Sequence, residues 1–306
     1  GVNDESRMGA LRLKLDKNGS FLAKGAGLEV PPFTSIRTLE EASLFLEKDD
    51  FYKHENAKKW LNILMAPGSS LGGARPKSNV RDTQGALWIA KFPSRNDEWD
   101  IGAWEYLVNQ LANSANLQVT DTLARRFSHH QHTFLSRRFD RTTDGKRIHF
   151  ASAMTLLGYK DGYDHHQGGS YLELVDLLER YGAAPQEDIK ALWKRIVFSV
   201  LVSNTDDHLR NHGFLLGENG WRLSPAYDIN PNPQGGGLSL NISDDDNSCS
   251  IKLCLAVAAY FRWKQIEAKE YIHHAIKCVQ QWPVIATRLG IAKAEQKMMS
   301  NAFLRI

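Results

Sequence analysis

The sequence predicts an α+β protein with two lobes, a strand-rich N-terminal lobe over residues 1–138 and a helical C-terminal lobe over residues 139–306. Two observations support this prediction. Before about residue 140, short apolar runs of alternating polarity are separated by turn-forming residues, which is typical of strands. After it, apolar residues recur at helical spacing, as in the heavily apolar stretch that contains IVFSVLV. We expect the hinge between the lobes at 136–141.

The N-terminal lobe should open with a strand, because MGALRLKL alternates apolar and polar residues. A helix should follow, with Thr38 as a candidate cap and glutamates in its first turn. Gly and Pro in PGSSLGGARPK then indicate a loop. The elements expected in this lobe are a strand at 8–15, a helix at 38–65, a loop at 67–77, a hairpin at 78–93, a helix at 98–113, and strands near 122–126 and 133–139.

The C-terminal lobe is expected to be mainly helical. SYLELVDLLERYG begins with a capping Ser and ends with Gly, which delimits a helix. A turn around Glu218–Gly220 indicates a hairpin between two short apolar strands. The expected elements are helices at 170–182, 187–204 and 265–289 and a hairpin at 213–230, with the helix at 187–204 in the centre.

The composition indicates a globular protein without a membrane span. The chain has 42% hydrophobic and 24% charged residues, which is ordinary for a folded domain. A net charge of +3 is too small to argue for nucleic acid or a membrane surface. Three cysteines without a CxxC pair fit a reducing compartment, and apolar runs such as LCLAVAAYF are too short to cross a bilayer. We therefore expect a cytoplasmic protein that makes no membrane contact.

The stretch NTDDHLRNH concentrates charge between two apolar segments. Phosphoryl transfer needs a carboxylate that accepts the hydroxyl proton and oxygen ligands that hold Mg²⁺. Asp206 and Asn211, followed by Asp228 at the end of the next hairpin, supply this set in the order of a kinase. The alternative is a solvated turn. Within the stretch, Asp207 is interpreted as a cap or a surface charge. His208 is grouped with the cofactor-binding residues, since it would orient the loop.

The N-terminal lobe contains residues suited to bind phosphate. Gly72 and Gly73 would let backbone N–H groups approach an anion closely, and Lys77 adds positive charge. Lys91 lies on a predicted strand after this loop, where a kinase has its phosphate-binding lysine, and Glu105 on the next helix could pair with it. A plain turn, a snorkelling lysine and a surface glutamate are the alternatives for these residues taken singly.

Five segments together resemble the HipA family of bacterial serine/threonine kinases, which are the toxins of toxin–antitoxin pairs. These segments are SSLGGARPKSNV, LWIAKFP, RRFDR, NTDDHLRNHGFLL and LSPAYDINP, and MGALRL near the start is similar as well. The resemblance covers roughly residues 7 to 260. It implies a two-lobed protein-kinase-like fold and ATP and Mg²⁺ as cofactors.

The resemblance also implies a role for each matching residue. The implied roles are Asp206 as catalytic base, Asn211 and Asp228 as Mg²⁺ ligands, Lys91 as ligand of the nucleotide phosphates with Glu105 beside it, Arg137 and Phe139 in a segment that meets adenine through its backbone, and Ser70 as the inhibitory autophosphorylation site. A phosphate on Ser70 would repel the phosphates of ATP from the loop that should bind them.

The family implies partners too. These are a HipB-like helix-turn-helix antitoxin, which would bring DNA into the complex only indirectly, and a protein substrate in translation, such as an aminoacyl-tRNA synthetase. Members usually carry a further N-terminal subdomain before the MGALR segment, so we expect a short member whose missing subdomain is a separate chain, or a trimmed product. Two other functions stay open: a small-molecule kinase on the same fold, and a catalytically silent partner that binds an antitoxin.

Three further features of the sequence indicate no single role. The polar segment KDGYDHHQGGS is a candidate substrate loop or a plain mobile loop. The paired histidines in it and elsewhere are not expected to bind a metal, because their spacing fits no compact ligand set. Basic residues around the later strands are expected to be scattered surface charge, among them Arg125, Arg126, Arg137, Arg138, Arg141, Lys146 and Arg147.

Overall fold

The computed structural model describes residues 4–22, 29–48, 50–53, 55, 57–58 and 75–303. The chain divides into two compact units. The first comprises Gly1–Tyr106 and Asp121–His149, and the second Leu107–Thr120 and Phe150–Ile306. The main boundary thus falls after residue 149, whereas the predicted lobes meet at 138/139. The segment 136–141, expected to be a hinge, lies wholly within the first unit.

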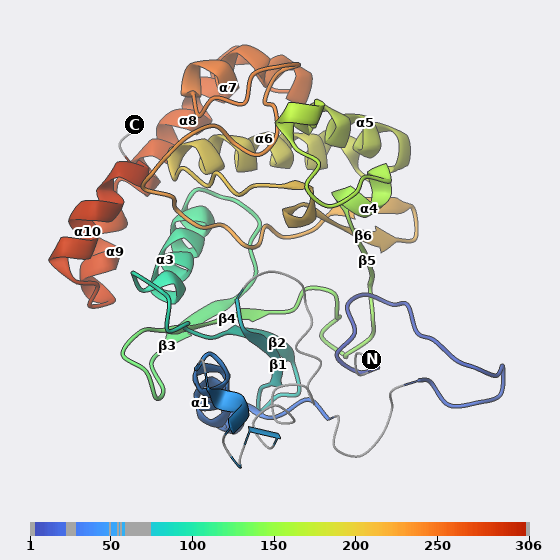
Figure 1. Ribbon diagram of the computed structural model, residues 1–306. Helices are drawn as coiled ribbons and strands as arrows, with labels where there is room; N and C mark the ends of the chain where they lie inside the picture. The colour runs from blue at the N-terminus through green and yellow to red at the C-terminus, as the bar shows by residue number, and fades with distance from the viewer. Residues whose placement is uncertain are drawn as a thin grey trace. The chain divides into compact units, whose positions relative to one another are not determined.

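The first unit is built on a four-stranded antiparallel sheet (Figure 1). Its elements are η1 (Phe33–Ser35), α1 (Ile36–Leu46), η2 (Phe51–Lys53), β1 (Lys77–Arg81), β2 (Leu87–Lys91), β3 (Thr122–Arg125) and β4 (Thr133–Arg137), and α3 (Ile101–Ser114) is divided between the two units. The strands pair in the order β1-β2-β4-β3. The structure therefore confirms the predicted hairpin, the helix near 98–113 and the two later strands.

The core of the first unit lies between α1 and the sheet (Figure 1). Its buried members come from α1 and three strands or their ends, namely Ile36, Leu39, Ala42, Val80, Trp88, Ala90, Phe92 and Leu135. Burying one large apolar side chain contributes about 1.5–3 kcal/mol. This cluster therefore fixes β2, and with it Lys91 at the end of that strand.

The start of α3 is fixed against the residues that precede β4. Asp100 Oδ1 accepts hydrogen bonds from the backbone N–H groups of Ala103 (3.1 Å) and His132 (2.9 Å), and its Oδ2 lies 2.6 Å from His132 Nδ1. Burial alone would raise the pKa of Asp100, but these hydrogen bonds and the charge of His132 lower it below its usual value. A Cβ at Gly102 would lie 2.1 Å from His132 O, so the close approach requires glycine. These contacts place Glu105 one turn further along α3.

Residues 8–15 do not form the predicted strand; they are bends and irregular backbone. No strand in the described part of the chain pairs with them, although a backbone hydrogen bond from Leu22 N to Leu13 O (2.8 Å) closes the loop. More than half of each alternating leucine stays exposed, at Leu11, Leu13 and Leu15. The alternating pattern therefore predicted a strand for which the described residues provide no pairing partner.

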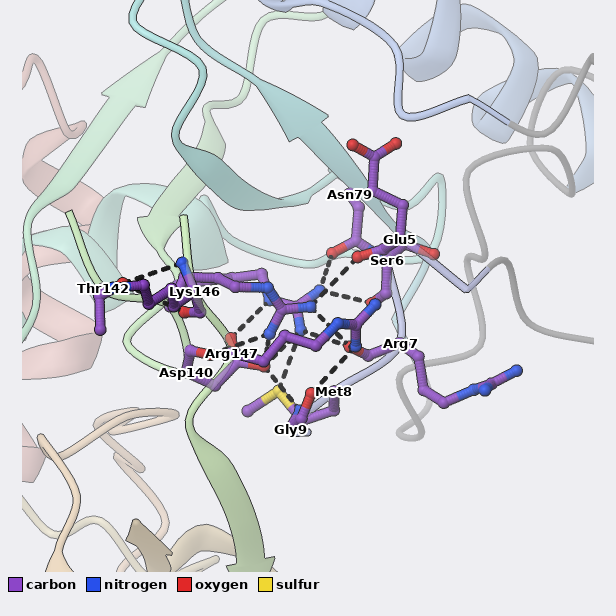
Figure 2. Close-up of polar contacts among 12 residues, drawn as sticks. Glu5, Ser6, Arg7, Met8, Gly9, Asn79, Asp140, Thr142, Lys146 and Arg147 are labelled. Carbon is purple, nitrogen blue, oxygen red and sulfur yellow. Dashed lines mark hydrogen bonds and ion pairs between the residues drawn. The ribbon is translucent and has the colours of Figure 1, made fainter. Parts of the chain in front are cut away.

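The segment at 4–9 is held by arginine side chains that follow β4 (Figure 2). Arg138, Arg141 and Arg147 donate to backbone carbonyl oxygens in this segment. The accepting carbonyls are those of Asp4, Glu5, Ser6, Arg7 and Gly9. The fully buried side chain of Asp140 pairs with Arg138 and Arg141, at 2.6 Å each. The expectation of scattered surface charge is therefore wrong for these three arginines.

The second unit is mainly helical, with one three-stranded sheet in the order β5-β6-β7 (Figure 1). Its elements are β5 (His149–Ser152), α4 (Ala153–Leu157), η3 (His165–Gln167), α5 (Tyr171–Tyr181), α6 (Pro185–Leu201), η4 (Leu209–Asn211), β6 (Gly213–Gly217), β7 (Gly220–Leu223), α7 (Ile251–Val257), η5 (Ala258–Phe261), α8 (Gln265–Val279), α9 (Trp282–Arg288), α10 (Lys293–Met299) and η6 (Ser300–Phe303). The helix near 170–182, with its Ser170 capping box, and the hairpin within 213–230 are confirmed.

α6 is the central helix of the second unit, as predicted. It contacts α5, α7, α8 and β7. Its apolar residues are buried on nearly all sides, including Ile189, Leu192, Trp193, Ile196, Val197, Phe198, Val200 and Leu201. The helix ends at Leu201, and two residues later Ser203 has a left-handed φ of +50°. The chain therefore turns sharply into NTDDHLRNH.

Two predicted helices are longer than the observed ones. The helix expected at 38–65 begins at Ile36 and ends at Leu46, while residues 59–65 lie outside the described residues. The helix expected at 265–289 is two helices, because Pro283 lacks an N–H group and opens α9. No helix in the described part of the chain is both long and apolar enough to cross a bilayer.

Candidate active site

The first group of candidate residues, here called the lysine group, consists of Lys77, Lys91 and Glu105. Lys91 Nζ lies 2.6 Å from Glu105 Oε1, and the two side chains are 14% and 5% exposed. The predicted pair between strand and helix is therefore present. Because a buried charge is costly without a partner, this contact offsets part of the cost of burying the two side chains. Lys91 Nζ also lies 5.7 Å from the ring centroid of Phe134 on β4.

Lys77 lies directly opposite Lys91 in the β1–β2 hairpin. Residues directly opposite each other in an antiparallel pair project from the same face of the sheet, and like charges there repel. The side chains of Lys77 and Lys91 thus project from one face of the hairpin, where Lys91 pairs with Glu105. Arg75, the arginine before β1, is instead bound to Asp97 at 2.7 Å.

The segment predicted to meet adenine follows β4. Arg137 ends the strand, and its N–H donates to Asp121 O at 2.9 Å. Its guanidinium lies 3.2 Å from the exposed Asp121 carboxylate. The N–H of Arg138 donates to Leu87 O on β2 (2.9 Å), and Phe139 is half-buried. The path of this backbone is therefore fixed by the sheet and by the buried arginine that follows.

The second group, here called the loop group, consists of Asp206, Asn211 and Asp228. The side chain of Asp206 is 85% exposed, with its Oδ1 3.8 Å from His208 Nε2. Asn211 is buried, and its Nδ2 donates to Asp206 O at 2.9 Å. His208 Nε2 also lies 3.3 Å from Arg210 Nη2. The loop thus presents a carboxylate to solvent while Asn211 fixes the backbone beneath it.

Asp228 is connected to this loop by a hydrogen bond that the preceding residue makes. Tyr227 Oη donates to Arg210 O (2.6 Å), which joins the residue before Asp228 to the residue before Asn211. Asp228 itself has a left-handed φ of +58° and accepts from Asn230 Nδ2 at 3.2 Å. A non-glycine residue with such backbone strain is uncommon and is concentrated at functional sites. Amide and carboxylate oxygens are the ligands that Mg²⁺ prefers, so Asn211 and Asp228 fit a Mg²⁺ ion by their chemistry.

The loop is tied to the segment after Asp228 by asparagine side chains. Asn204 Oδ1 accepts from Asn230 N (3.0 Å), and Asn232 Nδ2 donates to Thr205 Oγ1 (2.7 Å). Asn204 is 1% exposed, so this contact is shielded from water. These links position the two segments that carry the loop group.

Asp207 is neither a cap nor a surface charge, which corrects the interpretation from sequence. It is 5% exposed and accepts hydrogen bonds from Tyr171 Oη (2.7 Å) and Ser199 Oγ (3.2 Å). His212 Nε2 lies 3.1 Å from its Oδ1. Burial alone would raise the pKa of Asp207, but the charge of His212 and these contacts lower it. Asp207 therefore faces the interior of its unit, whereas the side chain of the neighbouring Asp206 is 85% exposed.

The candidate substrate loop lines a pocket together with Asp206, the only member of the loop group in its lining. The pocket has a volume of about 180 Å³ and is open to solvent, and its lining includes Lys160, Asp161, Tyr163, Asp206, His208 and Arg210. Arg210 pairs with Asp161. Backbone hydrogen bonds from His165 N to Ser239 O (2.9 Å) and from Asn241 N to Gly169 O (2.8 Å) fix the loop. It is therefore an ordered wall beside Asp206.

Two predictions from sequence end differently. Ser70, Gly72 and Gly73 lie outside the described residues, so their roles stay predictions. The paired histidines were expected to form no compact ligand set. At one pair, however, the ligand atoms of Asp164, His165 and His166 lie within 4.8 Å of one another.

Comparison with known proteins identifies the family. The family model described as the HipA-like C-terminal domain matches residues 69–283, more than half of the chain. The chain belongs to the HipA-like C-terminal domain family.

Two curated relatives carry names of kinases. "Putative kinase Y4mE" of Sinorhizobium fredii (strain NBRC 101917 / NGR234) is 29% identical over 148 residues, which cover 46% of this chain and 33% of that protein. A "Putative kinase" of Haemophilus influenzae is 27% identical over 188 residues, which cover 55% and 54%. The chain thus spans a third to a half of the length of these relatives.

Two solved structures resemble this HipA-like chain in fold. One is a Shewanella oneidensis MR-1 complex of the toxin–antitoxin proteins HipA and HipB with operator DNA, with a TM-score of 0.62, 18% identity, and coverage of 77% of this chain and 63% of that one. The other is the proinflammatory kinase CtkA of Helicobacter pylori, with a TM-score of 0.52, 15% identity, and coverage of 74% and 88%. The predicted α+β, kinase-like fold is therefore confirmed.

Proposed function

We propose that this HipA-like chain is an ATP- and Mg²⁺-dependent protein serine/threonine kinase, the toxin of a toxin–antitoxin pair. The observation that carries the proposal is the Lys91–Glu105 ion pair, because a strand lysine paired with a helix glutamate is what kinases use to hold nucleotide phosphates. The exposed Asp206 carboxylate supplies the second requirement, a group that a substrate hydroxyl can reach.

Each group has a defined part in the proposed reaction. Lys91 and Lys77 bind and orient the phosphates, with Glu105 holding Lys91 in place. Asp206 accepts the hydroxyl proton of the acceptor serine or threonine, which is worth roughly 10²–10⁴ in rate for a general base. Asn211 and Asp228 hold Mg²⁺. When bound, ATP supplies the γ-phosphoryl group and Mg²⁺ neutralises its charge.

The remaining parts of the proposal rest on the family resemblance. The backbone around Arg137 and Phe139 binds adenine, and His208 orients Asp206. Phosphate on Ser70 silences the enzyme, because a dianion beside Gly72 and Gly73 repels nucleotide phosphates. The substrate is a translation component such as an aminoacyl-tRNA synthetase. The partner is a HipB-like antitoxin, which brings DNA in indirectly.

Intact-mass spectrometry tests the proposal. The purified chain is incubated with ATP and Mg²⁺ beside an Asp206→Asn variant and an Asp245→Asn control, which changes an exposed aspartate of the same unit. We expect one added phosphate at Ser70 in the wild type and the control, and none in Asp206→Asn. Fully retained transfer in Asp206→Asn would remove Asp206 from the role of base.

A lysate supplemented with labelled ATP identifies the acceptor. Labelled protein bands support the protein kinase, and a labelled metabolite without labelled protein supports a small-molecule kinase. Nucleotide binding without any transfer, in protein that arrives unmodified, supports a silent partner instead.

A further inference from the structure

Asp207 and His212 enclose the loop that carries Asp206 and Asn211. Asp207 is the second residue of this loop and His212 follows its end, and both are at most 5% exposed. The carboxylate and the imidazole lie 3.1 Å apart, across the short helical turn η4 between them. Because the two ends of the turn meet in one buried contact, the loop between them has little freedom to change its path.

The same carboxylate also joins the loop to two helices. Asp207 Oδ2 accepts from Tyr171 on α5 (2.7 Å) and from Ser199 on α6 (3.2 Å), while Oδ1 faces His212 Nε2 at 3.1 Å. The Tyr171 ring meets the His212 ring edge-on, with centroids 5.5 Å apart and an angle of 88° between the planes. Burial also raises the pKa of Tyr171 well above its usual value, so its hydroxyl stays a donor. The loop is thus attached to the most deeply packed part of its unit.

Arg195, a buried arginine of α6, is a further charge that acts on this carboxylate. Arg195 donates to Ser224 O rather than to Asp207. A buried carboxylate that makes this many contacts fixes an orientation, because moving it would leave several polar groups unsatisfied.

We infer that Asp207 and His212 are positioning residues, which hold the backbone of residues 206–211 so that Asp206 faces solvent and Asn211 stays beneath it. The inference rests on the proposed function only where activity is measured. Next to the inward-facing Asp207, the Asp206 side chain is 85% exposed. Asn211 Nδ2 then reaches Asp206 O at 2.9 Å.

Asp188 offers a matched control. It is also a buried carboxylate of the second unit, 4% exposed, and accepts from Arg222 Nε (2.8 Å) and Leu223 N (3.1 Å). Its partners lie on β7 and not on the loop. Asp207→Asn and Asp188→Asn therefore remove one buried charge each, but only the first loosens the loop.

Two measurements on the full chain test the inference. Hydrogen–deuterium exchange followed by mass spectrometry reports on a peptide that covers 203–212, and a nucleotide-binding titration with ADP is run beside phosphate transfer from labelled ATP. We expect at least tenfold faster exchange of this peptide in Asp207→Asn and no change in Asp188→Asn. We also expect transfer at saturating ATP to fall at least tenfold in Asp207→Asn, with ADP affinity within about threefold of the wild type, since a general base contributes roughly 10²–10⁴.

A second variant keeps the test decisive. If the contact with His212 matters, the double variant Asp207→Asn/His212→Gln loses less transfer than the product of the two single losses, because residues in one contact are not additive. Unchanged exchange at 203–212 in Asp207→Asn, or an equal rise in Asp188→Asn, overturns the inference. A wild type that binds ADP but transfers nothing counts against the proposed kinase, while the exchange experiment still decides the role of Asp207.

Discussion

The lysine group and the loop group are held in place by different kinds of structure. Lys91 and Glu105 come from the end of β2 and from α3, two regular elements that hold their own backbone hydrogen bonds and bury their apolar side chains. Asp206 and Asn211 come from irregular backbone, and side chains that bond to backbone or to one another hold them. In the first case, one substitution removes one contact. In the second, one substitution can move the whole segment.

The largest expected effect comes from breaking the ion pair of the lysine group. Lys91→Met should abolish detectable phosphate transfer and also lower the free energy of unfolding by about 3–5 kcal/mol, because the buried Glu105 loses the ammonium group that lies 2.6 Å from its Oε1. The double variant Lys91→Met/Glu105→Gln should regain most of the stability but no transfer. Chemical denaturation and transfer from labelled ATP measure the two effects. Recovered transfer in the double variant would show that Lys91 does not contact the phosphates.

The second prediction concerns the pH dependence of the stability that the Asp100 contacts at the start of α3 provide. The pKa of Asp100 is lowered in the folded chain, so its stabilisation is present above the unfolded pKa of about 3.9 and is lost as pH falls through the folded value. At pH 7, Asp100→Asn should lower the free energy of unfolding by about 2–3 kcal/mol. Below about pH 4 the gap between variant and wild type should shrink. Asp245→Asn is the control, and a gap that stays constant with pH would contradict the assignment.

In the loop group, a modest loss of stability should be accompanied by a clear loss of phosphate transfer. Asn204→Ala leaves the N–H of Asn230 without its acceptor, which should cost about 1–2 kcal/mol. Because this contact links the two segments of the loop group, we expect phosphate transfer to fall about tenfold, equivalent to ~1.4 kcal/mol. Asn79→Ala is the matched control, since Asn79 is a buried asparagine of the first unit whose Oδ1 accepts from Arg138. Equal losses of phosphate transfer in Asn204→Ala and Asn79→Ala would contradict a specific role of Asn204 in positioning the loop group.

The smallest effect concerns a single hydroxyl. Tyr227→Phe removes the hydrogen bond to Arg210 O, which should lower stability by about 0.5–1.5 kcal/mol and transfer severalfold. Tyr271→Phe removes a hydroxyl that donates to Ala115 O at 3.1 Å, in the same unit but outside the loop. It should cost similar stability and leave transfer unchanged. Thermal denaturation and the transfer assay compare the two variants, and the reverse ranking of transfer would contradict the prediction.

Regular elements could be predicted from the sequence because their signals are local. The hairpin of β1 and β2, the helix α3 and the capped helix α5 follow from periodicity and end residues, and the Lys91–Glu105 pair follows from the order of strand and helix. The strand at 8–15 failed because pairing depends on a distant partner, which alternation cannot reveal.

The supports of the candidate site could not be predicted in the same way. Asp207 was interpreted as a cap or a surface charge, since its partners on α5 and α6 are set by tertiary packing. The buried arginines after β4 were likewise expected at the surface, although they bind the carbonyls of residues 4–9. Charged residue types are mostly exposed, so a buried one is visible from sequence only if its partner can be guessed.

The arginines that hold residues 4–9 contact carbonyl oxygens, which every amino acid possesses. The carbonyl contacts would let an exposed side chain of that segment, such as Glu5, change without loss of the interaction, whereas the buried Asp4 also pairs with Arg12 and Gly9 has a left-handed φ of +68°. Selection would instead act on the receiving side, at Arg138 and Arg141, and on their shared counterion Asp140. A scan that replaces each residue of the segment in turn should find the exposed Glu5 far more permissive than the buried Asp4 and Ser6, or than the arginines of RRFDR that bind the segment.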